Sequence, residues 1–160
     1  LGNPSKGFKQ FLKTLTGGRI TIGALGLGTA QGAFARALAY SQEREAFGKS
    51  INKFQGVSFK LSDMATQIEA ARHLVYHAAW KKDQGLPVIR EAAMAKLFSS
   101  ETAMQVTTEA IQVLGGYGYI KEYDVERFFR DAKILEIGEG TSEVQRMIIA
   151  KDLIQSVQTV

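Results

Sequence analysis

Apolar residues recur at steps of three and four along much of the chain. The clearest run covers residues 54–79, with apolar side chains at Phe54, Val57, Leu61, Met64, Ile68, Ala71, Val75 and Ala78. A strand alternates its side chains with a period of two and cannot produce this spacing. The run therefore predicts a long helix, and Gly85 and Pro87 mark its end.

A second run with the same spacing lies between residues 93 and 114. Its positions are Ala93, Leu97, Ser100, Met104, Thr107, Ile111 and Leu114. Gly115 and Gly116 follow directly, where a helix C-cap is expected. The small residues in this run predict that the helix packs closely against its neighbours.

Three further helices are predicted, over residues 19 to about 44, about 125 to 133, and 142 to about 154. The first is rich in Ala and Gly, and the last can be capped by Thr141 or Ser142. In the first of these helices, the apolar residues available for burial are Ile20, Leu27, Ala30, Phe34 and Leu38. Without an alternation of strands and helices, the pattern predicts an all-α fold, an antiparallel up-down four-helix bundle of long helices with short flanking helices.

Composition adds an expectation about domains. The chain has 160 residues, of which 45% are hydrophobic, and this is enough to bury one core. We therefore expect residues 1–160 to form a single helical-bundle domain. Because the sequence opens without Met, we also expect it to be one domain of a longer polypeptide.

The charge excludes some classes of partner. The net charge of +4 is spread along the chain, and Lys81 and Lys82 form its one basic doublet, so binding to nucleic acid is not expected. A basic surface could still attract an anionic ligand such as a nucleotide phosphate. The apolar stretches are interrupted well short of a membrane span, so membrane insertion is not expected. The absence of cysteine rules out disulfides and thiolate metal sites, and a reducing compartment is favoured.

Two patterns resemble ligand sites but have simpler explanations. GALGLGTAQG, at residues 23–32, is close to a dinucleotide-binding fingerprint, but it lacks the preceding strand, and small residues that permit close helix contact explain it better. Glu69, His73 and His77 share one helical face as possible metal ligands. The chain has only these two histidines and no Glu-x-x-His motif, so we expect no metal site.

Glu139 is the strongest candidate for chemistry. It stands between Gly138 and Gly140, after an apolar stretch and just before a predicted helix. Glycine permits backbone conformations and close approaches that other residues reach only at a cost. The pattern indicates that the carboxylate of Glu139 is aimed at a particular target.

Four motifs occur in order along nearly the whole chain, from about residue 7 to residue 153. They are TLTGGRI (14–20), SQEREAFGKSINKFQ (41–55), IQVLGGYGYIKEYDVERFFRDAK (111–133) and IGEGTSEVQR (137–146). Together they resemble the C-terminal helical domain of flavin-dependent acyl-CoA dehydrogenases, and in particular their short- and medium-chain members.

The resemblance implies a role for Glu139. In the family, the Glu of E-G-T removes an α-proton from an acyl thioester while a β-hydride passes to FAD, leaving a trans-2-enoyl-CoA. Such a base must be held at contact distance, in a pocket dry enough to raise its affinity for a proton. The N–H of Gly140 is then expected to bind the thioester carbonyl. Arg19, in GGRI, resembles a residue near the CoA moiety.

The resemblance also implies a set of contacts to FAD. Arg44 and Phe47 resemble the pair that reaches the FAD of a neighbouring subunit. The remaining positions that resemble cofactor contacts are Gln55, Gln112, Gly115, Gly116, Thr141 and Glu143. The family further implies a homo-oligomer, usually a tetramer, an electron-transfer flavoprotein as electron acceptor, and a cytoplasmic or mitochondrial-matrix location.

Several positions depart from the family pattern. Thr16 stands where relatives often have Asp, which alters the hydrogen bonding expected to the acyl-CoA. Ala46 stands where some relatives have Thr, so a hydroxyl contact is lost. Gly138 stands where a Tyr is common, which alters the predicted acyl pocket. Some branches place the catalytic Glu just before the Arg of the first helix. Here that position is Gly18, so only Glu139 can serve.

Two other classes of function stay open. One is a related flavoprotein oxidase, of the acyl-CoA oxidase or nitroalkane oxidase type. The other is a non-catalytic helical assembly module, against which the presence of both Glu139 and Arg44 argues. For the acyl-CoA dehydrogenase interpretation, we expect the full-length enzyme to oxidise a short- or medium-chain acyl-CoA, and the isolated chain to bind FAD weakly and to have little or no activity.

Overall fold

A computed structural model describes residues 2–157. It contains the helices α1 (Gly7–Glu43), α2 (Gln55–Asp83), α3 (Ile89–Leu114), α4 (Gly116–Tyr119), α5 (Val125–Ile137) and α6 (Ser142–Val157). Short 3-10 turns lie at Pro4–Lys6, Ile51–Lys53 and Lys121–Tyr123. The two strands β1 (Glu45–Ala46) and β2 (Lys49–Ser50) form one antiparallel hairpin.

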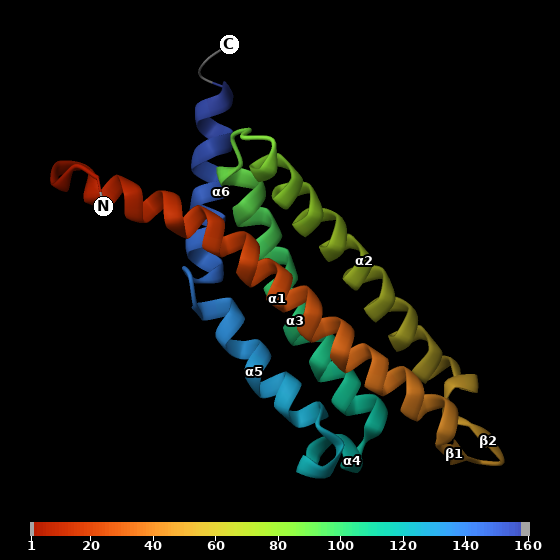
Figure 1. Cartoon of the computed structure of the whole chain (residues 1–160). Helices are drawn as coiled ribbons and strands as arrows, with labels where there is room; N and C mark the ends of the chain where they lie inside the picture. The colour runs from red at the N-terminus through yellow and green to blue at the C-terminus, as the bar shows by residue number, and fades with distance from the viewer. Residues whose placement is uncertain (1, 158–160) are drawn as a thin grey trace.

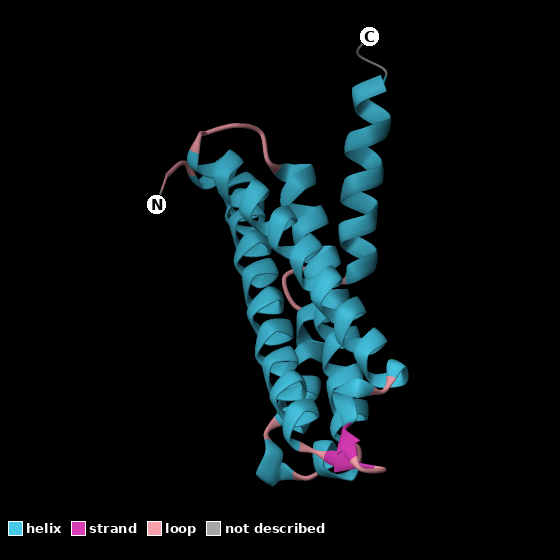
Figure 2. Ribbon diagram, turned by 90° about the vertical axis from the view of Figure 1, so that its right-hand side faces the viewer, coloured by secondary structure: helices cyan, strands magenta, loops and turns pink. Residues whose placement is uncertain are grey.

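The long helices lie side by side, with the strands at one end of the molecule and both termini toward the other (Figures 1 and 2). α3 is the central helix and packs against α1, α2, α5 and α6. The predicted all-α bundle is confirmed. Its fourth position is shared, because α5 packs along one half of α3 and α6 packs along the other (Figure 1).

The buried positions confirm the predicted face of α2. Leu61, Met64, Ile68, Ala71, Val75 and Ala78 are all buried. In α3 the predicted run is buried at Ala93, Ser100, Thr107 and Leu114 but only partly buried at Leu97, Met104 and Ile111. Because partners surround this helix, residues outside the run are buried as well, namely Ala92, Ala95, Ala103, Val106 and Ala110. None of the helices within residues 2–157 combines the length and the hydropathy needed to cross a bilayer.

The glycines of residues 23–32 confirm the interpretation as a packing surface. A Cβ added to Gly26 would lie 2.9 Å from the carbonyl oxygen of Ser99, and one added to Gly23 would lie 3.3 Å from that of Ala95. α1 and α3 therefore approach each other more closely than side chains at these positions would allow.

The predicted start of the first helix at residue 19 is wrong. α1 begins at Gly7 and runs through Gly17 and Gly18 without a break. Glycine lowers helix propensity but does not terminate a helix unless its neighbours adopt a cap conformation. The turns before residue 19 form a part of α1 that projects beyond the bundle (Figure 1).

The hairpin after α1 was not predicted. Its central residues Phe47 and Gly48 have φ values of 51° and 78°, as a tight type I′ turn requires. Glu45 pairs with Ser50, and Ala46 pairs with Lys49. The hairpin carries the chain from the end of α1 toward the start of α2.

Glu69, His73 and His77, which share one helical face, do not form a metal-binding cluster in the described structure. The carboxylate of Glu69 accepts a hydrogen bond from Nε of Arg72 at 2.9 Å, and His77 stacks on Trp80. Within the part of the chain that the structure describes, no three His, Cys, Asp or Glu side chains gather closely enough to hold a metal ion.

Candidate functional site

Glu139 lies in the short turn between α5 and α6. α5 ends when the N–H of Gly138 donates to the carbonyl of Ile134 at 2.8 Å. Glu139 and Gly140 then both take left-handed conformations, with φ values of 56° and 93°. α6 starts with Thr141 as its cap, because the N–H of Val144 donates to Oγ1 of Thr141 at 3.4 Å. The predicted cap is confirmed.

The carboxylate of Glu139 lies against α1. A Cβ added to Gly18 would be 2.7 Å from Oε2 of Glu139. Two positions far apart in the sequence therefore converge on one point in space. The missing side chain of Gly18 leaves the room that the Glu139 carboxylate occupies.

Arg19 lies beside this carboxylate. Its side chain is buried, and its Nε has no hydrogen-bond partner among the described residues. Burial lowers the pKa of Arg19, and the negative charge of Glu139 acts in the opposite direction. The predicted catalytic residue and one predicted substrate contact thus form an electrostatic pair at the start of the buried part of α1.

Glu139 itself is exposed in this structure. The reason is geometric: the turn borders a wide cleft of about 1550 Å³, which residues from several elements enclose only in part. The dry pocket expected around Glu139 when substrate enters stays a prediction. Only additional covering groups could keep water away from this carboxylate.

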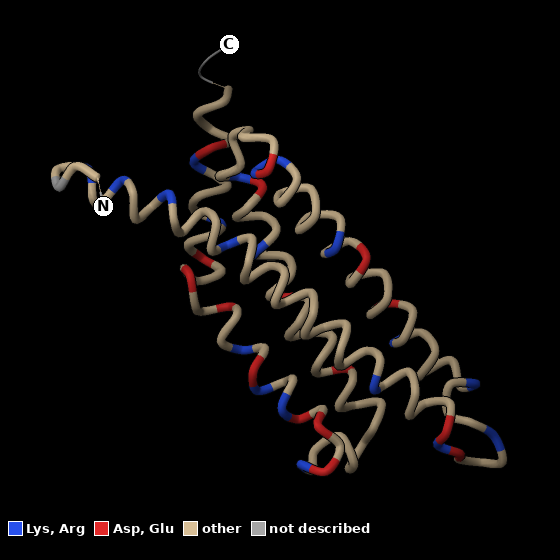
Figure 3. The backbone as a smooth tube through the Cα atoms, viewed as in Figure 1, with Lys and Arg blue, Asp and Glu red and all other residues tan. Residues whose placement is uncertain are grey.

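The cleft combines apolar walls with positive charge. It lies between the projecting part of α1, the loop from α2 to α3, the Glu139 turn and α6. Its apolar lining includes Leu12, Leu15, Leu86, Val88, Ile89, Val144 and Ile148, and its cations are Lys6, Lys9, Lys13, Arg19, Lys82 and Lys151. The first acidic residue of the chain is Glu43, so the projecting part of α1 carries only positive charges (Figure 3).

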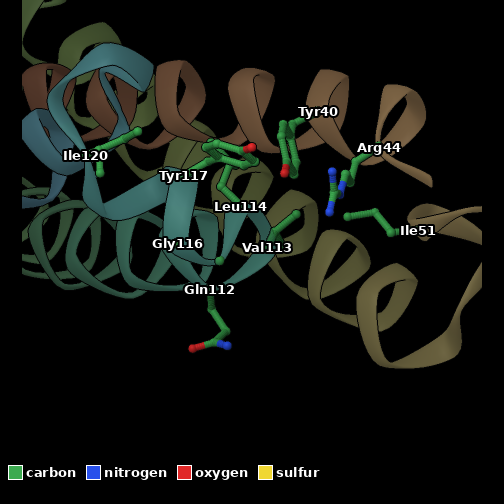
Figure 4. Close-up of a pocket in the computed structure, with 10 residues that line it drawn as sticks. Tyr40, Arg44, Ile51, Gln112, Val113, Leu114, Gly116, Tyr117 and Ile120 are labelled. Carbon is green, nitrogen blue, oxygen red and sulfur yellow. The ribbon is translucent and has the colours of Figure 1, made fainter. Parts of the chain in front are cut away.

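A second cavity, of about 500 Å³, lies near the other end of α1 (Figure 4). Its lining includes four of the predicted cofactor contacts, namely Arg44, Gln112, Gly115 and Gly116. The structure therefore brings together residues that come from α1 and from the end of α3. Figure 4 shows Arg44 beside Tyr40, whereas the side chain of Gln112 points away from both.

The rings of Tyr40 and Tyr117 line this cavity, and the ring of Tyr123 packs near both of them. The ring centroids of Tyr40 and Tyr117 are 6.3 Å apart, and those of Tyr117 and Tyr123 are 4.9 Å apart. Burial raises the pKa of Tyr40, and the positive charge of Arg44 acts in the opposite direction. The guanidinium of Arg44 makes no ion pair with a carboxylate among the described residues, so it is available to an anion.

The other predicted cofactor contacts lie outside this cavity. Phe47 is at the tip of the hairpin, 96% exposed, and Gln55 is at the exposed start of α2. Thr141 and Glu143 lie beside Glu139 at the start of α6. Backbone and Thr141 hydrogen bonds lower the pKa of Glu143. The predicted set is thus divided between two regions of the molecule.

The two regions are far apart. Arg19 and Arg44 both belong to or directly follow α1, and a helical rise of about 1.5 Å per residue separates them by roughly 37 Å. The Glu139 cleft and the Arg44 cavity are therefore distinct sites at opposite ends of the bundle.

Two buried polar side chains near Glu139 were missed by the sequence reasoning. Gln145 is fully buried, and its Nε2 donates to the carbonyl of Gly140 at 2.8 Å and to that of Glu139 at 3.3 Å. Lys96 is also fully buried, and its Nζ has no hydrogen-bond partner within residues 2–157. The sequence contained an indication of this burial, because Lys96 lies within the apolar pattern of the predicted second helix.

The electrostatics around Lys96 involve three elements. Burial lowers its pKa, Glu136, Glu101 and Glu143 act to raise it, and Arg19 adds to the lowering. The ammonium group is therefore held where α3 meets the ends of α5 and α6, close to the turn that carries Glu139.

Known proteins resemble this chain closely. The sequence model of a family described as "Acyl-CoA dehydrogenase, C-terminal domain" matches residues 5–154. A probable acyl-CoA dehydrogenase of Bacillus subtilis is 57% identical over 97% of this chain and 41% of its own length. The chain thus spans about two fifths of that relative.

Solved structures give the same result. Butyryl-CoA dehydrogenase from Megasphaera elsdenii matches with a TM-score of 0.95 and 55% identity, over 96% of this chain and 40% of its own. A chain in the structure of the electron-transferring flavoprotein of Acidaminococcus fermentans matches with a TM-score of 0.95 and 54% identity, with the same coverage of 96% and 40%.

Proposed function

Because the chain belongs to the acyl-CoA dehydrogenase family, whose C-terminal domain matches residues 5–154, we propose that it is the C-terminal domain of a longer FAD-dependent acyl-CoA dehydrogenase. The whole enzyme oxidises a short- or medium-chain acyl-CoA to a trans-2-enoyl-CoA. The observation that carries this proposal is the position of the Glu139 carboxylate, which borders the cleft against Gly18.

The turn between α5 and α6 supplies two groups to the reaction, the Glu139 carboxylate and the Gly140 N–H. An α C–H beside a thioester is a weak acid, so its base must be held in contact with it. A carboxylate oxygen of Glu139 takes the α-proton as the carbon–carbon double bond forms. The N–H of Gly140 donates to no acceptor among the described residues, so it can donate to the thioester oxygen as negative charge develops there.

The cleft fits an acyl-CoA in both of its parts. Its apolar side chains suit an acyl chain, whereas its lysines suit the phosphates of CoA. The butyryl-CoA dehydrogenase of M. elsdenii, which shares this fold at 55% identity, supports a short acyl chain.

The Arg44 cavity fits part of an FAD molecule. The guanidinium of Arg44 can donate two parallel hydrogen bonds to pyrophosphate oxygens. A Cβ added to Gly115 or Gly116 would meet nothing within 4 Å, so a ligand can approach this backbone closely, and the Tyr40 and Tyr117 rings can stack on a planar base. When bound, FAD supplies the acceptor for the β-hydride.

The separation of the two sites supports a homo-oligomer, with a tetramer as the proposed state. In such an assembly, Arg44 and Phe47 of one subunit reach the FAD that serves Glu139 of another. An electron-transfer flavoprotein is the proposed electron acceptor, in line with the related chain found in a structure of such a flavoprotein. The proposed location is the cytoplasm or the mitochondrial matrix.

The test uses the full-length protein with FAD, butyryl-CoA and an electron-transfer flavoprotein. We expect the wild type to reduce the acceptor and Glu139→Gln to lose at least about 10²-fold in kcat, because Gln cannot take the proton. Unchanged thioester oxidation in Glu139→Gln would falsify the proposal. Hydrogen peroxide production without acceptor reduction would instead identify an oxidase.

A matched experiment concerns the isolated chain. It lacks the cover that would exclude water from Glu139, so we expect weak FAD binding and little turnover from residues 1–160 alone. Robust turnover by this chain would contradict that expectation.

A further inference from the structure

The turn that carries Glu139 has an unfavourable backbone conformation. Glu139 has a φ of 56°, a value that residues with a side chain adopt rarely, and Gly140 follows with a φ of 93°. Such a conformation persists only where the surrounding structure holds it. The group that holds this turn also determines where the Glu139 carboxylate points.

Gln145 makes the side-chain contacts that hold it. Its Nε2 donates to two successive carbonyl oxygens, those of Glu139 and Gly140, at 3.3 Å and 2.8 Å. The side chain is fully buried, and the N–H of Gln145 donates to the carbonyl of Thr141 at 3.0 Å. Gln145 is therefore itself fixed within the first turn of α6.

Peptide geometry links these contacts to the reaction. In a trans peptide, the carbonyl and the N–H point to opposite sides of the chain. When Gln145 holds the carbonyl of Glu139 toward the protein interior, the N–H of Gly140 in the same peptide unit must point outward, toward the cleft. The contact also sets the direction of the Glu139 side chain on the neighbouring Cα.

Gly140 has no side chain to obstruct this contact. A Cβ added to Gly140 would lie 2.9 Å from Nε2 of Gln145 and 3.2 Å from a methyl carbon of Val144. Glycine at this position thus adopts the positive φ without strain and leaves room for the amide of Gln145.

We propose that Gln145 is a positioning residue, whose buried amide aims both the Glu139 carboxylate and the Gly140 N–H at the reacting thioester. This inference rests on the proposed function of the whole enzyme. Gln145 touches neither substrate nor cofactor in this scheme, and it acts through the backbone of residues 139 and 140.

The experiment compares Gln145→Met with Ser142→Ala in the full-length, FAD-loaded enzyme. Met retains the length and burial of Gln but cannot donate a hydrogen bond. Ser142 is a matched control, since it is buried in the same turn and its Oγ has no partner among the described residues. Both variants are compared with the wild type for kcat, KM, FAD content and thermal unfolding.

We expect Gln145→Met to lower kcat by about 10²-fold with little change in KM, because a misplaced base slows the chemical step most. The kinetic isotope effect on kcat with α-deuterated butyryl-CoA should increase, since proton removal becomes rate-limiting. A loss of stability alone would not change this isotope effect. Ser142→Ala should match the wild type in each measurement.

A second variant covers a failure of Gln145→Met to fold. Gln145→Glu has the same shape, and its carboxylate repels the two carbonyl oxygens, so the same loss in kcat and the same rise in isotope effect are expected. A wild-type kcat and isotope effect in either folded variant overturns the inference, as does a failure of both variants to fold, which would show a structural role.

The outcome also separates this inference from the proposed function. If the wild type oxidises butyryl-CoA and Glu139→Gln does not, an unaffected Gln145→Met overturns only the role of Gln145. If the wild type itself does not oxidise acyl-CoA thioesters, the proposed function fails first.

Discussion

At the scale of residues, the position of the Glu139 carboxylate depends on the absence of a side chain at Gly18. The carboxylate occupies space that any side chain at Gly18 would fill. Arg19 follows directly and contributes a buried positive charge. Since a catalytic carboxylate must be held within a fraction of an ångström, a single methyl group at residue 18 is expected to matter.

Gly18→Ala tests this contact. In the full-length enzyme we expect kcat to fall at least about tenfold, because the added Cβ displaces the Glu139 carboxylate. Steady-state kinetics with butyryl-CoA provide the measurement. Gly28→Ala is the control, since its Cβ enters open space on the same helix. Equal activity of the two variants would contradict the role given to Gly18.

Lys96 gives a prediction about pH. Burial lowers its pKa in the folded chain, whereas in the unfolded chain it takes its usual pKa of about 10.4. Between these two values the unfolded chain binds more protons, so the free energy of unfolding rises with pH across this window. The facing charges are Glu101 on α3, Glu136 on α5, Glu143 on α6 and Arg19 on α1.

We therefore expect Lys96→Met to lose this rise in stability toward alkaline pH. Urea unfolding of the chain at a series of pH values from neutral upward measures it. Lys53→Met, which removes an exposed ammonium group, should retain the wild-type slope. The same slope in Lys96→Met and the wild type would show that Lys96 does not cause it.

At the scale of elements, the bundle depends on the close contact between α1 and α3. Two glycines of α1, Gly23 and Gly26, lie against backbone carbonyls of α3. This contact places α1 so that its two ends reach two different sites. The GALGLGTAQG segment is thus explained by helix packing.

Gly26→Ala tests this packing. Its Cβ would lie 2.9 Å from the carbonyl oxygen of Ser99, and backbone cannot move aside cheaply, so we expect a loss of about 1–3 kcal/mol in the free energy of unfolding. Gly28→Ala should instead gain up to about 1 kcal/mol through helix propensity. Denaturant unfolding measures both, and a stabilised Gly26→Ala would refute the packing argument.

At the scale of the whole molecule, α1 connects two sites that a single bundle cannot bring together. The Glu139 cleft lies at one end and the Arg44 cavity at the other. In the proposed oligomer, the Arg44 of one subunit completes the site of another. The exposed hairpin beside the cavity, with Phe47 at its tip, is placed to reach a partner.

Subunit mixing tests this arrangement. Full-length Arg44→Ala and Glu139→Gln subunits are each expected to form poorly active enzymes. Co-expressed hybrids should recover activity, since some sites then combine an intact Arg44 from one subunit with an intact Glu139 from the other. If the hybrids stay as inactive as the two parents, both residues serve a site within one subunit.

The sequence by itself determined the all-α class, the buried face of α2 and a cap at Thr141 or Ser142, and its family resemblance implied a role for Glu139. The first three follow from local periodicity and cap chemistry, whereas the role of Glu139 is what the resemblance carried by four motifs implies. It also indicated Arg44, Gln112, Gly115 and Gly116, and the structure places these in one cavity.

Only the tertiary structure decided how distant residues meet. Glu139 and Gly18 are separated by more than a hundred positions, and their contact depends on how α1 crosses the turn between α5 and α6. The burial of Gln145 and Lys96 depends on the neighbours of α6 and α3, which no local pattern specifies. Likewise, the exposure of Glu139 follows from the wide cleft beside its turn, and the division of the predicted cofactor contacts between two regions follows from the length of α1. Periodicity identifies the faces of a helix, but the packing of the helices determines which faces meet.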